Sequence, residues 1–357
     1  MKERSKRLSE LLPDARIDVM MVTDIVNVRY LTGYTGSNGL ALIGPQTRTF
    51  ITDFRYVEQA AEEVHPSFER RRAPLDLLEA VPDALPSDIA RLGFEDAQLS
   101  VRQHERLREL LAERLELVAA GTLVEQLRAL KEPEEVEAIR KAAALADDAF
   151  ERVIAGGVVG RTEREVALAL EWEMLEHGAR APSFPSIVAT GPNGALPHHS
   201  RRDVQIQHGD MVVIDWGAQV DGYCSDCTRT IAGGHPSAEA EEVYELVLEA
   251  QLAGMAAVRA GASARQVDAT ARVVIEAAGY GAQFGHGLGH GVGLDIHEGP
   301  RLSQRSDGAL KAGNVVTVEP GVYLPHRFGV RIEDMVVVTD DGCEVLTSVG
   351  KELRVTD

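Results

Sequence analysis

Residues 285–298, GHGLGHGVGLDIHE, carry His286, His290 and His297 within twelve positions of a chain that has 11 histidines. Five glycines separate them, and each glycine loses much backbone entropy in a helix or strand. The stretch therefore predicts an irregular loop whose backbone lies close to another group, where side chains larger than hydrogen would not fit. Imidazoles held on such a loop suit metal ligation or proton transfer. A flexible, solvated loop with incidental histidines is the alternative.

The length and charge of the chain limit the classes of protein it can belong to. With 357 residues and 44% hydrophobic content, we expect a sizeable core and two domains. The net charge is −19; residues 1–131 carry 18 Lys+Arg against 21 Asp+Glu, or −3, which leaves −16 for residues 132–357. Such a chain is poorly suited to bind nucleic acid or an anionic membrane, and no apolar run reaches bilayer length. We expect neither partner.

The N-terminus and the cysteines indicate the compartment. Residues 1–12, MKERSKRLSELL, are charged and amphipathic and contain no apolar core of a secretion signal. Three cysteines, an odd number, give no disulfide framework and fit a reducing environment. We expect a cytoplasmic protein.

The first 131 residues alternate predicted strands with predicted helices. Strands are expected over 18–22, 40–43, 49–51 and 91–94, helices over 2–12, 53–64 and 101–113, and a turn-rich loop over 27–39. This alternation predicts an α/β layer with a mixed or parallel sheet. The segment GYTGSNG in the loop is the only candidate for ligand contact here, with a plain turn as the alternative.

A domain boundary is expected at Lys-Glu-Pro, residues 131–133. Pro133 fits the first turn of a helix that runs to about residue 154. Thr162 and Glu165 form a predicted capping box, which opens a second helix that ends at Gly178. The predicted domains are therefore residues 1–131 and 132–357.

A strong hairpin follows at residues 210–233, DMVVIDWGAQVDGYCSDCTRTIAG. Its two β-rich runs join across Asp-Gly at 221–222, a favoured two-residue turn. This register pairs Gly217 with Asp226, so that Asp215 and Asp226 share a face as diagonal neighbours, roughly 7–8 Å apart. Two carboxylates on one face of an apolar hairpin repel each other unless a positive charge lies between them.

The same pattern recurs in the last third of the chain. A helix is expected over residues 238–259, and Ser263 with Gln266 is a predicted capping box for a helix that ends near residue 279. After the glycine–histidine loop come two predicted strands, VVTVEPG with Glu319 and GVRIEDMVVV with Glu333. The recurrence predicts two similar α+β halves that direct acids from both sides into a shared cleft.

Four carboxylates and one imidazole are thus the candidate constellation: Asp215, Asp226, His290, Glu319 and Glu333. Four acids that converge on one point repel each other strongly without cations, and two divalent ions would balance their charge. A carboxylate-rich set favours a hard ion such as Mn²⁺ over a structural zinc, although Co²⁺ or Zn²⁺ can also bind it.

The motifs that carry these residues resemble those of the pita-bread metallopeptidases, in the aminopeptidase P and prolidase branch. They are ALPHHS, VVIDWGAQVDGYCSDCTRT, GHGLGHGVGLDIHE, TVEPGVY and GVRIED, and YLTGYTGSNG with TDFRYVEQA resembles the preceding domain of that branch. The resemblance implies an α+β fold, with a pita-bread catalytic domain after a smaller creatinase/prolidase-like α/β domain. It also implies two bridged metal ions, usually manganese, in a homodimer or higher oligomer.

The resemblance also implies individual roles for the five candidate ligands. Asp215 would chelate one ion, Asp226 and Glu333 would bridge both ions, and His290 and Glu319 would complete the other.

Four further residues match positions around the substrate in that branch. His198 matches the substrate-facing histidine, although adjacent His199 leaves that choice open. His286 and His297 match the two flanking histidines, and Arg331 matches an arginine that supports the ligands.

The implied chemistry is hydrolysis by a hydroxide that bridges the two ions, because bound metals lower the pKa of water. His297 and His198 would stabilise the oxyanion, and Glu319 would carry the proton to the leaving nitrogen. We predict an Xaa-Pro aminopeptidase that acts on short peptides with proline at the second position. The alternative is an Xaa-Pro dipeptidase, which must hold the carboxylate of proline, and a remoter one is a non-catalytic pita-bread binding protein.

Overall fold

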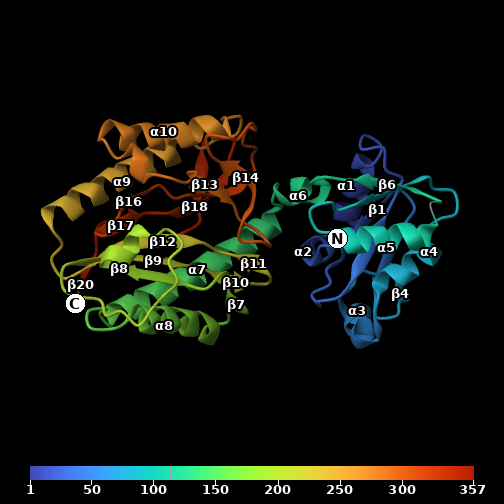
Figure 1. The fold of residues 1–357 in the computed structure, drawn as a ribbon, viewed down its shortest axis with the longest axis horizontal. Helices are drawn as coiled ribbons and strands as arrows, with labels where there is room; N and C mark the ends of the chain where they lie inside the picture. Colours follow the sequence, from blue (N-terminus) through green and yellow to red (C-terminus); the bar gives the residue numbers. More distant parts are fainter. Residues whose placement is uncertain (113) are drawn as a thin grey trace. The chain divides into compact units, whose positions relative to one another are not determined.

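The computed structural model describes residues 1–112 and 114–357 and forms two units, Met1–Arg128 and Ala129–Asp357 (Figure 1). The boundary expected from the sequence lies a few residues later, between 131 and 132. Within the described residues, no helix has both the length and the apolar composition that a bilayer crossing requires.

A six-stranded sheet in the order β4-β3-β2-β1-β5-β6 forms the centre of the first unit. Its strands are β1 (Val19–Val22), β2 (Leu40–Ile43), β3 (Arg48–Thr52), β4 (Glu69–Arg72), β5 (Arg91–Phe94) and β6 (Glu116–Ala119). Parallel and antiparallel pairs both occur, so the sheet is mixed, which is one of the two arrangements predicted. The two edge strands β4 and β6 were not predicted, since neither is a buried apolar run.

The helices of the first unit are α1 (Lys2–Leu11), α2 (Ile25–Thr32), α3 (Val57–Glu63), α4 (Val81–Ala84), α5 (Val101–Leu111) and α6 (Leu123–Arg128). The loop predicted over 27–39 is wrong in its first part, where α2 lies. Asp24 caps this helix by accepting from the backbone N–H groups of Val26 and Asn27, and Gly33 ends it at φ 89°. Glu113, the last residue of one predicted helix, lies outside the described residues.

Four helices of the second unit form two pairs. They are α7 (Pro133–Ala155), α8 (Glu163–Glu176), α9 (Ala238–Ala257) and α10 (Ala264–Ala277). The capping box of Thr162 and Glu165 is present and opens α8 as predicted. The one predicted at Ser263 is wrong: Ser263 occupies the cap position but makes no side-chain cap bond, and its backbone bridges to Ala309.

The strands of the second unit fall into several short sheets. They are β7 (Ala181–Pro182), β8 (Ile187–Thr190), β9 (Asp210–Trp216), β10 (Ala218–Val220), β11 (Tyr223–Cys224), β12 (Cys227–Gly233), β13 (Gly289–Gly291), β14 (Glu298–Leu302), β15 (Val315–Val318), β16 (Gly321–Leu324), β17 (Phe328–Arg331), β18 (Asp334–Val338), β19 (Cys343–Val345) and β20 (Val355–Thr356).

Two sheets carry the architectural repeat that the sequence predicts. Their orders are β20-β12-β9-β8 and β14-β13-β15-β18-β19, and the antiparallel pairs β9/β12 and β15/β18 occupy equivalent places. Figure 1 shows α7 and α8 on one side of the strands of this unit and α9 with α10 on the other. Each helix pair packs with its own strands into a separate buried apolar cluster. The two halves therefore face each other through their strands.

The predicted hairpin register is correct, but its ladder is interrupted where Asp226 lies. Trp216 pairs with Cys227 and Gln219 with Cys224, which keeps Gly217 opposite Asp226, but neither of these two belongs to a strand. The hydroxyl of Ser225 accepts from the backbone N–H of Ala218 at 2.9 Å, where the carbonyl of Ser225 would accept in a regular ladder, while the backbone N–H of Ser225 still donates to the carbonyl of Ala218. The single strand predicted over 329–338 is likewise broken between β17 and β18, where Glu333 lies.

Candidate active site

Breaks and ends of strands position the five predicted metal ligands. Asp215 lies near the end of β9, Asp226 directly precedes β12, and His290 lies in β13. Glu319 follows β15, and Glu333 precedes β18. All five line one pocket of about 600 Å³. The structure therefore brings together residues that the sequence separates by more than 100 positions.

Three of these side chains lie within reach of a single ion. Ligand atoms of Asp226, His290 and Glu333 lie within 4.8 Å of one another. His290 Nε2 is 3.6 Å from Asp226 Oδ2 and 3.3 Å from Glu319 Oε1. Asp215 is held by Arg331, whose guanidinium donates to Asp215 Oδ2 at 2.7 Å.

Burial makes negative charge costly at this point. It raises the pKa of Asp226 and of Glu333 well above their usual range, and the charges of neighbouring acids add to the effect. Burial also raises the pKa of Asp215 and of Glu319. The pKa of His290 is lowered, again first by burial, which favours the neutral imidazole that binds metals.

The donor set fits divalent metal ions. Asp215 Oδ1 and Glu333 Oε1 are buried and have no hydrogen-bond partner within the described structure. Buried carboxylate oxygens are otherwise paired in folded proteins, so these two require a cation or a proton. Carboxylates with a single imidazole are typical of a site for hard or borderline divalent ions.

A hydrogen-bonded chain connects a flanking histidine to Asp215. Tyr323 accepts from Arg331 at 2.9 Å and donates to His286 Nε2 at 2.9 Å, while His286 Nδ1 donates to the carbonyl of Gly287. The Arg331 side chain is buried and also donates to Asp215. Tyr323 was missed from the sequence, although it lies four residues beyond Glu319, an even spacing that fits one face of an extended segment.

The structure places the two adjacent histidines in opposite surroundings. His198 is exposed and lines the pocket, whereas the His199 side chain is buried and its Nε2 lies 2.8 Å from Glu163 Oε2. Both histidines line the pocket, but only His198 is exposed there, while His199 is engaged by Glu163. His297 lines it too, with its ring centroid 4.4 Å from that of His290.

Two arginines that line the pocket were not singled out from the sequence, Arg201 and Arg301, and Arg201 pairs with Glu171. Arg301 is exposed and lines the pocket near His297, where its charge contributes, after burial, to a lowered pKa of that histidine. Within the part of the chain that the structure describes, Arg301 pairs with no carboxylate, in contrast to Arg201. Phe184 and Ile296 line the same pocket with apolar surface.

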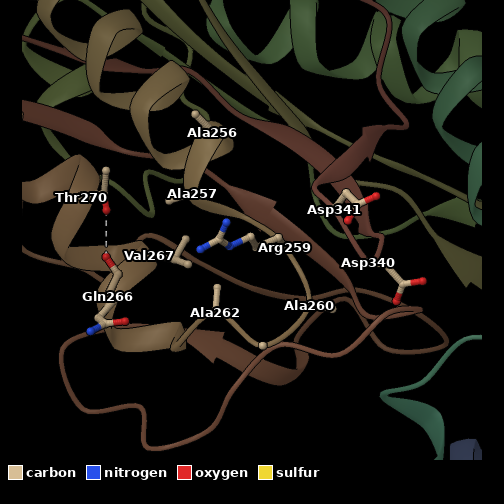
Figure 2. Close-up of a pocket in the computed structure, with 11 residues that line it drawn as sticks. Ala256, Ala257, Arg259, Ala260, Ala262, Gln266, Val267, Thr270, Asp340 and Asp341 are labelled. Atoms are coloured by element: carbon tan, nitrogen blue, oxygen red, sulfur yellow. Dashed lines mark hydrogen bonds between the residues drawn. The ribbon is translucent and has the colours of Figure 1, made fainter.

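A second hollow, of about 740 Å³, contains none of the predicted site residues. Figure 2 shows it between the end of α9 and the start of α10, with Arg259 beside small alanine side chains and Asp340 on the opposite wall. The dashed line in Figure 2 is the bond from the Thr270 hydroxyl to the backbone carbonyl of Gln266, which lies within α10. Nothing in this hollow resembles the acid and histidine constellation.

Two facing halves with four convergent acids and a histidine define a metalloenzyme of the pita-bread fold. The chain belongs to metallopeptidase family M24: the pattern of that family matches residues 137–340, and the pattern of the creatinase/prolidase N-terminal domain matches residues 4–130. The predicted family and fold are thereby confirmed, and the chain is a metallopeptidase.

Relatives of known name cover nearly the whole chain. An Xaa-Pro dipeptidase of Pyrococcus furiosus is 39% identical over 99% of this chain and 100% of its own length. The structure of an Xaa-Pro dipeptidase from Bacillus anthracis is 42% identical with a TM-score of 0.96, and covers 99% of each chain. That of an X-Pro aminopeptidase from Thermotoga maritima is 36% identical with a TM-score of 0.90, over 99% of this chain and 100% of that one.

Proposed function

We propose that this metallopeptidase is an Xaa-Pro dipeptidase, which hydrolyses the bond between an N-terminal residue and a C-terminal proline. The observation that carries the proposal is Arg301, a cation in the pocket whose charge pairs with no carboxylate in the described residues. A dipeptide ends in a carboxylate, and a guanidinium is the side chain best suited to bind one. The relatives named as Xaa-Pro dipeptidases support this reading over the aminopeptidase expected first.

The proposal includes two divalent metal ions, with Mn²⁺ as the expected metal. Asp215, Asp226, His290, Glu319 and Glu333 would hold them. When bound, such ions lower the pKa of water and polarise a carbonyl oxygen, which supplies a nucleophile near neutral pH.

The residues of the chain itself have separate tasks around the scissile bond. His198 and His297 line the pocket and would donate to the oxygen on which negative charge develops. Glu319 would accept the proton of the attacking water and deliver it to the leaving nitrogen of proline. Arg331 and Tyr323 keep Asp215 and His286 in place through their hydrogen bonds.

Arg301 would give the enzyme its length specificity. A charge-assisted hydrogen bond to a carboxylate contributes about 1.5–3 kcal/mol, or roughly 10- to 150-fold in binding. An Xaa-Pro-Xaa peptide has a neutral amide at this position and would not gain that interaction.

Comparing Xaa-Pro with Xaa-Pro-Xaa peptides of the same first residue tests the proposal. We expect kcat/KM to be higher for the dipeptide by roughly 10-fold or more. Equal or faster turnover of the tripeptide would instead establish the aminopeptidase.

Arg301→Gln provides the matching substitution. It should raise KM for Xaa-Pro by roughly 10-fold or more and leave KM for Xaa-Pro amide, which has no carboxylate, nearly unchanged. Arg305→Gln, at an exposed position outside the pocket, is the control for loss of charge on the same segment. An equal effect of Arg301→Gln on both substrates would show that it does not bind the carboxylate.

The proposal also includes a homodimer or higher homo-oligomer and a cytoplasmic location, both as expected from the sequence. Light scattering of the purified chain measures the first, and fractionation of cells that express it measures the second.

A further inference from the structure

A fully buried carboxylate, that of Glu163, lies behind the pocket at the start of α8. Its Oε1 accepts from the backbone N–H of Thr190 at 2.9 Å and from the side chain of Asn193 at 2.8 Å. Its Oε2 accepts from His199 Nε2 at 2.8 Å and from the backbone N–H of Arg202 at 2.9 Å. One carboxylate thus binds four donors spread over residues 190–202.

These donors lie on both sides of His198, the exposed histidine of the pocket. Thr190 and Asn193 precede His198 in the chain, and His199 and Arg202 follow it. No strand covers the segment between the end of β8 at Thr190 and the start of β9 at Asp210; it contains a short 3-10 helix, Gly191–Ala195, and the carbonyl of Pro197 accepts from Arg331 at 3.3 Å. The four bonds to Glu163 join the two ends of this segment, on both sides of His198, to one fixed carboxylate.

Capping of α8 does not explain Glu163. The side chain of Thr162 already accepts from the backbone N–H of Glu165, and Glu165 returns the bond to the N–H of Thr162. The helix start is therefore satisfied without Glu163. A carboxylate loses favourable hydration when it is buried, and only several well-placed donors offset that loss. The donors that Glu163 uses all come from the segment that carries His198, not from its own helix.

We propose that Glu163 is a positioning residue that holds His198 in its place toward the scissile bond. The inference rests on the proposed function, because it assumes that His198 acts on the substrate. Glu163 reaches the pocket only through residues 190–202 and touches none of the five proposed ligands.

Glu163→Gln tests the inference with little change in shape. Its amide nitrogen cannot accept a hydrogen bond, so one pair of donors loses its acceptor. Because misplacement of a reacting group by about 1 Å can cost 100-fold, we expect kcat for Xaa-Pro to fall by roughly 10- to 100-fold. Metal content should equal that of the wild type. Val166→Ala, which trims a buried side chain on the same helix, is the control and should keep kcat within about twofold.

The decisive comparison repeats the substitution in a chain that lacks the histidine. In a His198→Ala background, Glu163→Gln should cause no further loss of kcat, because the group that it positions is gone. If Glu163→Gln lowers kcat in the His198→Ala background as much as it does in the wild type, Glu163 acts through another group than His198 and the inference is wrong.

Amide hydrogen exchange gives a second readout that does not need activity. Glu163→Gln should accelerate exchange in residues 190–202, where Thr190 and Arg202 donate, and leave residues 284–302 unchanged. Unchanged exchange in 190–202 would overturn the inference. A wild-type chain that hydrolyses no Xaa-Pro peptide would refute the proposed function, while the exchange result would still decide whether Glu163 holds the segment.

A second pair of variants applies if Glu163→Gln does not fold. His199→Gln retains a nitrogen donor toward Glu163, whereas His199→Leu removes it. We expect the first to keep most of kcat and the second to lose roughly 10-fold. Equal activity of the two variants would contradict the inference.

Discussion

We predict that Asp147 makes the stability of the second unit fall as the pH rises, which is the reverse of the usual effect of an acidic residue. It lies on α7, is 3% exposed, and its Oδ2 accepts from the backbone N–H and hydroxyl of Ser348 at 2.5 and 2.8 Å. Its Oδ1 is buried without a partner in the described structure. Burial raises the pKa of this carboxyl from its ordinary 3.8 to about 6.

A folded-state pKa above the unfolded one means that the folded state binds the proton more tightly. The resulting stabilisation is complete below pH 3.8 and is lost as the pH rises through 6. A shift of roughly two units at about 1.4 kcal/mol each gives an amplitude of about 3 kcal/mol. Asp147→Asn mimics the protonated acid, so its free energy of unfolding should gain about 2.4 kcal/mol on the wild type between pH 4 and pH 7.5, because part of the amplitude is already lost at pH 4. The unpaired amide nitrogen adds a cost, but that cost does not vary with pH.

Guanidinium unfolding followed by tryptophan fluorescence measures this difference in metal-free protein. Both tryptophans, Trp172 and Trp216, lie in the second unit, and Trp216 stacks on Phe150 of α7 at 4.2 Å. Asp148→Asn, at the exposed neighbouring position, is the control for loss of one charge. A difference between wild type and Asp147→Asn that stays constant from pH 4 to pH 7.5 would refute the reasoning.

Three further predictions concern the metal site. Arg331→Met should lower kcat/KM for Xaa-Pro by roughly 100-fold and destabilise the fold by about 3–5 kcal/mol, because it leaves the buried carboxylate of Asp215 without its cation. Arg331→Lys keeps the charge and should lose less activity and less stability. Steady-state kinetics and denaturant unfolding measure both effects, and equal losses in the two variants would disprove the prediction. Asp226→Asn should lower both bound metal, measured by elemental analysis, and turnover, and the ligand assignment is wrong if neither changes. Removal of metal by a chelator should abolish activity and lower Tm. Addition of Mn²⁺ at about 100 times its Kd should then raise the free energy of unfolding by about 2.7 kcal/mol. If no divalent ion restores turnover, the mechanism does not depend on metal.

The sequence was sufficient where local rules and periodicity decide the structure. The Asp-Gly turn at 221–222 fixes a register that the structure retains, and this register follows from the twist that two-residue turns impose. Alternation of faces along the strands then places Asp215 and Asp226 near each other without knowledge of the tertiary fold. The repeat of helix, helix and two strands predicted the second pair of acids in the same way.

The sequence was insufficient where a residue takes its role from a distant partner. Glu163 has the position of an ordinary acid in the first turn of a helix, and nothing local indicates that its donors lie 27 to 39 residues away. Arg301 is one of 37 basic residues, and only the pocket distinguishes it. The helix α2 was missed because its β-branched residues disfavour a helix weakly, while tertiary burial and the cap at Asp24 favour it more strongly.

The division of the site between two halves explains why its acids can be buried at all. The first half supplies Asp215 and Asp226, and the second supplies Glu319 and Glu333. The halves are joined where the charges meet: Glu333 accepts from the hydroxyl of Thr228 at 2.7 Å, and its backbone N–H donates to the carbonyl of that residue. Repulsion among the acids therefore weakens the contact between the two halves near Glu333 and Thr228, and bound cations would remove that repulsion. We therefore expect metal binding to stabilise the contact between the two halves.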